Sequence, residues 1–215
     1  MSFQNAFLGS LVADAISMPV HWYYNRKSLD QDYGDFQGYC KPKAFHPDSI
    51  LWRSSYIPHG PKADILGTQT KYWGQRGIHY HQFLEAGDNT LNLQLAAELY
   101  RETIINGDFD PETWLNRYAQ VMLTPGWHQD TYAEEYHRAF FTNYSKGKSL
   151  HSCGISDYHI GGLSLVPALL AGMEAVVQIQ PSEQIEKVLN LVRLTHDHEN
   201  TLRAATDLTR ILQKL

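Results

Sequence analysis

The sequence predicts an all-α protein. After residue 89, apolar residues recur at helical spacing over most of the chain. Residues that typically begin or end helices bracket these stretches. Finally, no alternation of apolar and polar residues persists with the period of a strand. We expect residues 1–215 to form one helical domain, because a chain of this length can bury one sizeable core.

The first expected helix covers residues 3–18. Its apolar residues recur at every fourth position, and Pro19 ends it because proline disfavours a helical conformation in the residue before it. A second stripe of this helix is small or polar and contains Asp14, and His21 follows the proline. Two interpretations remain open: both residues belong to a functional site, or Asp14 accepts backbone donors at the next helix while His21 is structural.

Residues 25–84 show no sustained period. We expect an ordered, aromatic-rich excursion over the surface, with a helix within residues 71–84. A polar and aromatic patch at residues 67–74 contains Tyr72 and Trp73. Either ring is able to stack against a sugar or a base, although packing at the surface is the commoner outcome for such rings.

From residue 89 onward, helices dominate. Gly107 suits the end of one helix, and Asp110 with Pro111 suits the beginning of the next. The expected helices cover residues 89–106, 110 to the Pro125–Gly126 stop, 130–144, 164–179 and 182–194, and a last helix carries Leu202 to Leu215.

The last helix ends on an apolar face. Leu208, Leu212 and Leu215 share this face, and no capping residue or polar tail follows them. An apolar helix face normally packs against another element. We therefore expect this face to be incompletely covered, with the chain a piece of a longer protein, unless the helix docks on its own domain.

Composition narrows the functional classes. Hydrophobic residues make up 43% and charged residues 19%, which is typical of a globular protein. A formal net charge of -5 without a block of Lys or Arg argues against nucleic-acid binding. No apolar run reaches membrane-spanning length. Cys40 and Cys153 provide neither a disulfide framework nor zinc-ligand spacing, so we expect a reducing, cytoplasmic location.

An acidic and polar turn at residues 85–90 precedes a long apolar helix. Hard cations prefer oxygen ligands, and the start of a buried helix holds such ligands rigidly. Asp88 and Asn89 are therefore candidate metal ligands. The alternative is that Asp88 or Asn89 caps the helix, since both residue types are favoured at that position.

Two further loops are candidates for binding. Residues 152–156 contain Cys153 and Gly154 and lead through a glycine pair to an apolar helix, whose backbone N–H groups are able to hold phosphate oxygens. A plain loop is the alternative. Residues 195–200 contain His196 and Asp197, which suit metal ligation or, alternatively, a polar turn with Asp197 as a helix cap.

Taken in chain order, four segments resemble the ADP-ribosylglycohydrolase family. The aromatic stretch from His21 to Tyr24 is most similar to the branch that contains the J1-type lens crystallins. Ala13–His21 is similar to the N-terminal motif of the family, and Gly87–Thr90 is similar to its metal motif. Cys153–Gly154 with Val166–Leu169 is similar to its Cys-Gly loop and the helix after it. Thr195–His196 is similar to its Thr-His element.

The resemblance implies a compact, multi-helix orthogonal bundle. It also implies a hydrolase that cleaves a glycosidic bond of ADP-ribose on a protein side chain or a small acceptor, with two Mg²⁺ ions and a metal-bound water. On this basis, the ADP-ribosylated protein or small molecule is the expected partner. The resemblance implies that Asp14, His21 and Asp88 are catalytic and that Asp88 and Asn89 are metal ligands. It implies substrate binding by Cys153, Gly154, Ile155, Ser156 and His196. We expect Asp14, Asp88 and the Cys153–Gly154 loop to line one concave site.

The sequence departs from the family pattern at several of these positions. His21 stands where the family often has Glu, Asn89 replaces a carboxylate, and Ile155 stands where Asn is usual. The family's C-terminal metal motif would lie beyond Leu215. We therefore expect weak or absent binding of two Mg²⁺ ions, because Mg²⁺ gives up hydration only for well-placed anionic oxygens.

Two alternative functions follow. One is a catalytically degenerate relative that binds ADP-ribose or serves as a crystallin-like structural protein. The other is an HD-type metal phosphohydrolase, since that all-α family carries a His-Asp doublet like His196–Asp197. The second alternative requires other histidines to meet His196 around one metal.

Overall fold

The computed structural model describes residues 2–35 and 37–214, and its regular structure is helical. Within these residues there is no β-strand; two isolated bridges join Phe45 to Ile78 and Ile155 to His196. The all-α prediction is confirmed. The α-helices are α1 (Phe3–Ser17), α2 (Arg26–Tyr33), α3 (Leu91–Asn106), α4 (Pro111–Met122), α5 (Glu135–Ser145), α6 (Val166–Val176), α7 (Pro181–Arg193) and α8 (Glu199–Leu212).

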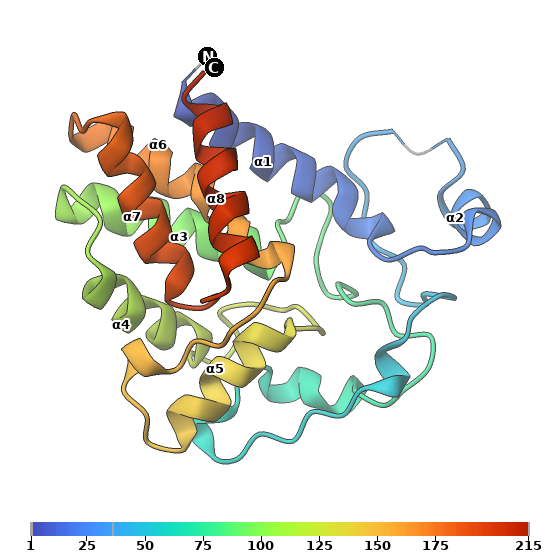
Figure 1. Ribbon diagram of the computed structural model, residues 1–215. Helices are drawn as coiled ribbons and strands as arrows, with labels where there is room; N and C mark the ends of the chain where they lie inside the picture. The colour runs from blue at the N-terminus through green and yellow to red at the C-terminus, as the bar shows by residue number, and fades with distance from the viewer. Residues whose placement is uncertain (1, 36, 215) are drawn as a thin grey trace.

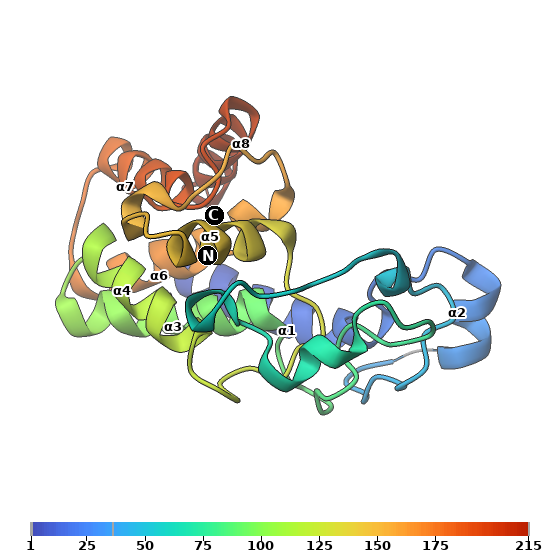
Figure 2. The ribbon, with the colours of Figure 1, turned by 90° about the horizontal axis from the view of Figure 1, so that it is seen from below.

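The helices form one body, and a largely irregular segment lies beside it. Helix α6 packs against both α1 and α3, while α7 pairs with α8 (Figure 1). Helix α2 and the chain that follows it lie away from α7 and α8, as the view from below also shows (Figure 2). Among the helices described, none is long and apolar enough to cross a membrane.

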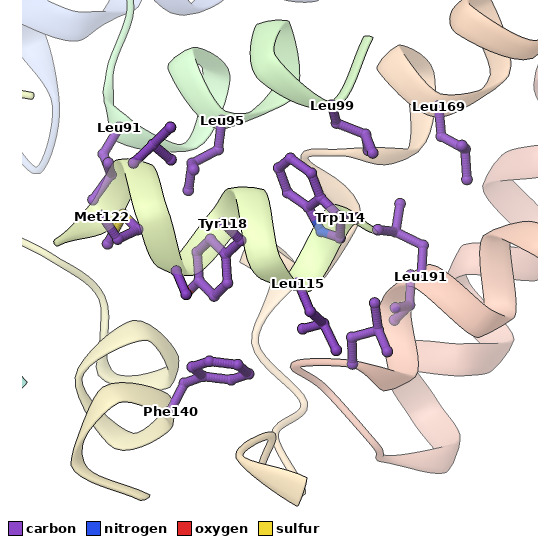
Figure 3. Close-up of a cluster of buried hydrophobic side chains, with 14 of the residues drawn as sticks. Leu91, Leu95, Leu99, Trp114, Leu115, Tyr118, Met122, Phe140, Leu169 and Leu191 are labelled. Carbon is purple, nitrogen blue, oxygen red and sulfur yellow. The ribbon is translucent and has the colours of Figure 1, made fainter. Parts of the chain in front are cut away.

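The main core lies between α3 and α4 and extends to α5, α6 and α7 (Figure 3). Helix α3 buries Leu91, Leu95 and Leu99, which recur at every fourth position and so share one face. Helix α4 contributes Trp114, Leu115, Tyr118 and Met122. Phe140, Leu169 and Leu191, from α5, α6 and α7, belong to the same cluster. Each fully buried Leu side chain contributes about 1.5–3 kcal/mol to the free energy of unfolding.

Local signals define several helix ends as expected. The Asp110 carboxylate accepts the N–H of Thr113 at 2.7 Å, and Pro111 occupies the first turn of α4. Gly107 ends α3 with a φ of 73°, in the left-handed region that suits glycine. Two boundaries were wrong: α5 begins at Glu135 rather than at residue 130, and α6 ends before Val177, where the backbone becomes extended.

The segment between α2 and α3 differs from expectation. Residues 71–84 do not form a helix; the structure has instead a 3₁₀ helix at Gly67–Tyr72 and turns after it. Nor does the segment merely cross the surface, because Leu51, Ile65 and Tyr80 are buried in the main core. Side-chain hydrogen bonds to the backbone replace helical ones here, and such long-range partners cannot be recognised from local periodicity.

The apolar face of α8 is better covered than expected. Leu212 is only 9% exposed and Leu208 packs against the core, because α8 lies against α7 and α6. Ile211, which faces away, is 59% exposed. The expectation of an incompletely covered face is therefore wrong for Leu212, whereas Leu208 is half-buried and borders a cavity. Leu215 lies outside the described residues.

Candidate functional site

Two adjacent cavities share a wall made by Trp22, Tyr132 and Glu134. The first, which we call the histidine cavity, has a volume of about 470 Å³ and is lined by polar groups that include Asp14, His21, His81, Asp130 and Glu134. The second, the aromatic cavity, has a volume of about 480 Å³; its lining includes Tyr24, Tyr80, Tyr136, Ile155, Ser156 and Tyr158.

Asp14 holds the beginning of α3. Its carboxylate accepts the backbone N–H of Thr90 at 2.7 Å, the Thr90 hydroxyl at 2.8 Å and the side-chain amide of Asn89 at 3.0 Å. The first N–H groups of a helix have no partner within the helix, and a carboxylate there also favours the positive end of the helix dipole. Of the two interpretations of Asp14, this contact matches the one in which it accepts backbone donors at the next helix.

Asp130 also holds the beginning of this helix, one residue further along the chain. One carboxylate oxygen accepts the N–H of Leu91 at 2.5 Å, and the other accepts Nδ1 of His81. Asp130 and His81 are both buried. The start of α3 is thus capped by Asp14 and Asp130, not by Asp88 or Asn89 as the capping alternative proposed.

A chain of hydrogen bonds extends from Asp130 to the end of α1. Nε2 of His81 lies 3.0 Å from Nδ1 of His21, and Nε2 of His21 lies 3.1 Å from the hydroxyl of Ser17. Burial, followed by the neighbouring His81, lowers the pKa of His21 to about 4, although Asp130 acts in the opposite direction. His21 is therefore a neutral imidazole at pH 7.

Two other buried histidines hold the loop that carries His21. Nε2 of His46 donates to the carbonyl of His21 at 2.8 Å, and Nε2 of His79 donates to the carbonyl of Pro19 at 3.0 Å. Burial lowers the pKa of His79 to about 3, so that ring stays neutral as well. Both rings come from the irregular segment between α2 and α3, which thereby positions the catalytic candidate at the end of α1.

Trp22 adopts a backbone conformation that is unfavourable for a tryptophan. Its φ is 58°, and it is the one residue other than glycine with a positive φ among those described. The indole stacks on His81 at 5.6 Å between ring centroids and meets the edges of Tyr80 and Tyr132. Such strain persists only where surrounding contacts impose it, and it often marks functional sites.

Glu134 faces both cavities from the turn before α5. Its carboxylate accepts the side-chain amide of Asn92 at 2.8 Å and lies 3.7 Å from Nδ1 of His159. Burial raises its pKa, and the hydrogen bond from Asn92 opposes that shift without cancelling it. Gly161 permits this arrangement, since a Cβ there would come within 2.7 Å of the Glu134 carboxylate.

Asn92 joins Glu134 to a second buried network. Its amide oxygen accepts the hydroxyl of Tyr136 at 2.8 Å and Nε2 of His137 at 3.0 Å. Nδ1 of His137 in turn lies 2.6 Å from the hydroxyl of Tyr118. The amide of Asn92 is thus fixed in one orientation, with its NH₂ group toward Glu134.

The expected convergence of Asp14, Asp88 and Cys153–Gly154 on one concave site is not found. Asp88 lines a different cavity of about 690 Å³ and accepts the N–H of Glu85 at 2.8 Å within its own turn. Successive residues at the start of α3 face different sides, so Asp88 and Asn89 border that cavity while Thr90 borders the histidine cavity. The catalytic roles expected for Asp14 and Asp88 stay predictions.

Part of the loop at residues 152–156 is packed in the interior, and part of it lines the aromatic cavity. Cys153 is fully buried, and a Cβ at Gly154 would come within 2.5 Å of the Leu194 carbonyl, so the glycine allows two segments to approach closely. Ile155 and Ser156 do line the aromatic cavity. The phosphate-binding role expected for this loop is untested.

His196 is a packed residue. It is 0% exposed, its ring lies 4.3 Å from that of Tyr136, and Nδ1 lies 2.8 Å from the hydroxyl of Thr195. Burial lowers its pKa to about 4. The cap of α8 is His198, whose Nδ1 accepts the N–H of Asn200, rather than Asp197.

The aromatic patch at residues 67–74 is used in packing. Trp73 is buried, donates its indole N–H to the Thr131 carbonyl at 2.9 Å and stacks on Tyr132. Tyr72 packs against Phe83. Trp73 therefore offers no face to a ligand; the rings that do so are those of the aromatic cavity.

The donor set does not fit the expected pair of Mg²⁺ ions. Within residues 2–35 and 37–214, no group of three or more His, Cys, Asp or Glu side chains is arranged to hold a metal. The Asp14 oxygens already accept three donors, and one of these is the Asn89 amide. An NH₂ group stands where a bound cation would need an acceptor.

Sequence reasoning missed the central residues of the site. His81, Asp130, Glu134 and Asn92 belong to no motif that it recognised. The only local signal is the recurrence of histidine at His79 and His81, which lie in a turn where Nδ1 of His79 accepts the N–H of His81. Asp130 and Glu134 lie in a loop that was expected to be the first turn of a helix.

Comparison with known proteins gives one match. A family model described as ADP-ribosylglycohydrolase matches residues 2–215, nearly the whole chain. Comparison with curated proteins and with solved structures gives no match.

Proposed function

Because the chain belongs to the ADP-ribosylglycohydrolase family, we propose that it hydrolyses a glycosidic bond between ADP-ribose and a protein side chain or a small acceptor. One observation carries the proposal beyond the family. Glu134 and His21 line the same cavity, and burial raises the pKa of the carboxyl while it lowers that of the imidazole. A raised pKa favours the protonated carboxyl, which can donate a proton, and a lowered pKa keeps the imidazole neutral, which can accept one.

The proposed step requires both groups. His21 accepts a proton from water at Nε2, and the water oxygen forms a bond to the anomeric carbon of the ribose. The bond from that carbon to the acceptor atom breaks, and Glu134 gives its proton to the leaving atom. This scheme uses side chains of the histidine cavity alone, in accordance with a donor set that does not fit Mg²⁺.

The shared wall suits a substrate with two parts. The aromatic cavity offers Trp22, Tyr80 and Tyr132 for stacking against the nucleobase. In our proposal the ribose to be cleaved lies in the histidine cavity, and Ile155 and Ser156 contact the remainder of the nucleotide. The Glu134 side chain, which borders both cavities, lies where these two parts of the substrate meet.

The experiment is a release assay in EDTA. Purified protein is incubated with ADP-ribose attached to arginine, to serine and to a carboxylate ester, and free ADP-ribose is measured. We expect turnover of at least one linkage, and a fall in kcat of roughly 10²–10⁴-fold in Glu134→Gln and in His21→Gln. Glu199→Gln is the matched control, since Glu199 is an exposed glutamate at the start of α8.

A second candidate is a relative that binds ADP-ribose without cleaving it, or a crystallin-like structural protein. The amide of Asn89 on Asp14 favours it, because this contact leaves a family metal position without its carboxylate. Calorimetry with ADP-ribose separates the outcomes. Binding without turnover of any linkage supports the non-catalytic binder and contradicts the hydrolase; neither binding nor turnover supports the structural role.

The phosphohydrolase alternative finds no support in this arrangement. It requires several histidines around a metal at His196, but the His196 ring is buried against Tyr136 and Gly162. Cytoplasmic location stays a proposal that rests on two free cysteines, Cys40 and Cys153. Imaging of the full-length natural protein in its own cell tests the location, and secretion would contradict it.

A further inference from the structure

The hydrogen bonds of His21, His81 and Asp130 determine where their protons lie. The Asp130 carboxylate can only accept, so Nδ1 of His81 carries the hydrogen that faces it. In a neutral ring, Nε2 of His81 is then an acceptor, and Nδ1 of His21 must be the donor across the 3.0 Å contact. Nε2 of His21 is left without a hydrogen, and it accepts the hydroxyl of Ser17 at 3.1 Å.

We infer that Asp130, His81 and His21 form a relay of fixed polarity, in which Asp130 and His81 are positioning residues that keep Nε2 of His21 free of hydrogen. Every donor in the relay points toward Asp130, and the free lone pair is at the opposite end, beside the Ser17 hydroxyl. The inference rests on the proposed function for its use of His21 as a base. The polarity follows from the contacts between two neutral rings and does not depend on turnover.

Ser17 is suited to the open end of the relay. Its hydroxyl has two acceptors within reach, Nε2 of His21 at 3.1 Å and the carbonyl of Asp14 at 3.2 Å. When the hydroxyl turns to the Asp14 carbonyl, Nε2 of His21 becomes available to a water molecule. No change of backbone is required for this step.

The backbone of Leu91 makes the polarity testable. In Asp130→Asn, the side-chain oxygen must face the Leu91 N–H, because that donor belongs to the first turn of α3 and cannot move. The NH₂ group then faces Nδ1 of His81, which has to become an acceptor. His81 and His21 would both shift their hydrogen to Nε2, so a single substitution reverses the whole relay.

Two neighbouring histidines provide internal controls. His46 donates from Nε2 to the His21 carbonyl and accepts the Asp48 N–H at Nδ1. His79 donates from Nε2 to the Pro19 carbonyl and accepts the His81 N–H at Nδ1. Backbone groups fix both rings as Nε2–H, independently of the side chain at residue 130.

The experiment is long-range ¹⁵N–¹H NMR of the imidazole rings in protein labelled with ¹⁵N-histidine at pH 7. Individual His→Gln variants assign the signals. For the unsubstituted protein we expect His21 and His81 as the Nδ1–H tautomer and His46 and His79 as Nε2–H. For Asp130→Asn we expect His21 and His81 to change to Nε2–H while His46 and His79 stay unchanged.

Two further variants separate the causes. Ser17→Ala removes the hydroxyl at the open end and should leave both tautomers as they are, because Asp130 sets the polarity. Asp108→Asn removes a carboxylate that pairs with Lys187, remote from the relay, and should change none of the four rings. Circular dichroism establishes that each variant is folded; if Asp130→Asn unfolds, the unsubstituted protein and Ser17→Ala still decide the matter.

Several results would overturn the inference. These are an Nε2–H tautomer of His21 in the unsubstituted protein, an imidazolium at His81, or unchanged tautomers in folded Asp130→Asn. The test is independent of turnover, so the relay stands if the tautomers match and no linkage is cleaved. If turnover is found, Asp130→Asn should lower kcat roughly a hundredfold or more with KM little changed.

Discussion

Asp14 and Thr90 lie 76 positions apart in the chain, and the carboxylate of Asp14 accepts both the backbone N–H and the hydroxyl of Thr90. This contact joins the last turn of α1 to the beginning of α3. The carboxylate of a residue expected to be catalytic thus caps a helix to which that residue does not belong. The same contact explains why Asp14 has a fixed position at the edge of the histidine cavity.

Removal of the Asp14 carboxylate should destabilise the fold. Asp14→Ala leaves the Thr90 N–H without its partner at the start of α3, so we expect the free energy of unfolding to fall by about 1–3 kcal/mol in urea titrations. The control is Asp88→Ala, because Asp88 is exposed and accepts a donor only within its own turn. A larger loss for Asp88→Ala than for Asp14→Ala would contradict this account of the cap.

Gly154 should tolerate no side chain. In Gly154→Ala the new Cβ meets the Leu194 carbonyl at 2.5 Å, and a backbone atom cannot move aside without displacing the turn after α7. We expect a loss of about 1–3 kcal/mol, measured by thermal and urea unfolding. Gly9→Ala is the matched control, since nothing lies within 4 Å of its Cβ position on α1; it should raise stability by up to about 1 kcal/mol.

The strain at Trp22 can be separated from its packing. Trp22→Ala and Trp22→Gly both remove the indole, but only glycine adopts a φ of 58° without cost. We therefore expect the alanine variant to be less stable than the glycine variant by about 1 kcal/mol in urea unfolding. Equal stabilities would show that the backbone at residue 22 relaxes once the indole is gone.

Buried neutral histidines should make the fold sensitive to acid. Burial is the chief cause that lowers the pKa of His21 and His196 to about 4 and that of His79 to about 3, from an ordinary value of 6.5. Between these values the unfolded chain binds more protons than the folded one, so stability is lost as pH falls from about 6.5 toward 4. Unfolding midpoints measured between pH 7.5 and pH 4.5 should fall accordingly.

A single substitution tests the origin of this acid sensitivity. His79→Gln removes one buried imidazole, and the slope of stability against pH below 6.5 should become shallower, whatever the stability at pH 7.5. His59→Gln is the control, since His59 is exposed. A slope that is the same in His79→Gln and the unsubstituted protein would exclude His79 as a source.

Asn89 should control the response to Mg²⁺. The unsubstituted protein should show no shift in melting temperature with millimolar MgCl₂, because the Asn89 amide already donates to Asp14. Asn89→Asp places a second carboxylate against that of Asp14, which should destabilise the protein in EDTA and introduce stabilisation by Mg²⁺. Calorimetry measures both proteins; tight Mg²⁺ binding by the unsubstituted chain would contradict the structural argument.

The sequence by itself determined the helices with strong local signals and, through the order of its motifs, the family. Helix α4 illustrates this. Asp110, Pro111 and the apolar residues at i, i+4 spacing lie close together in the chain, and the same residues that predict the helix also form it. The family was also predicted from the sequence, because the prediction depends on the order of motifs along the chain.

Only the tertiary structure decided the site. Asp130 reaches Leu91 across 39 positions, His81 reaches Asp130 across 49, and His21 reaches His81 across 60. None of these pairs has a recognisable spacing in the sequence. Each hydrogen bond depends on where the folded backbone places the two atoms. Asp14 and Asn89 were visible as polar residues at informative positions, but whether they bind each other or a cation depends on geometry that folding alone creates.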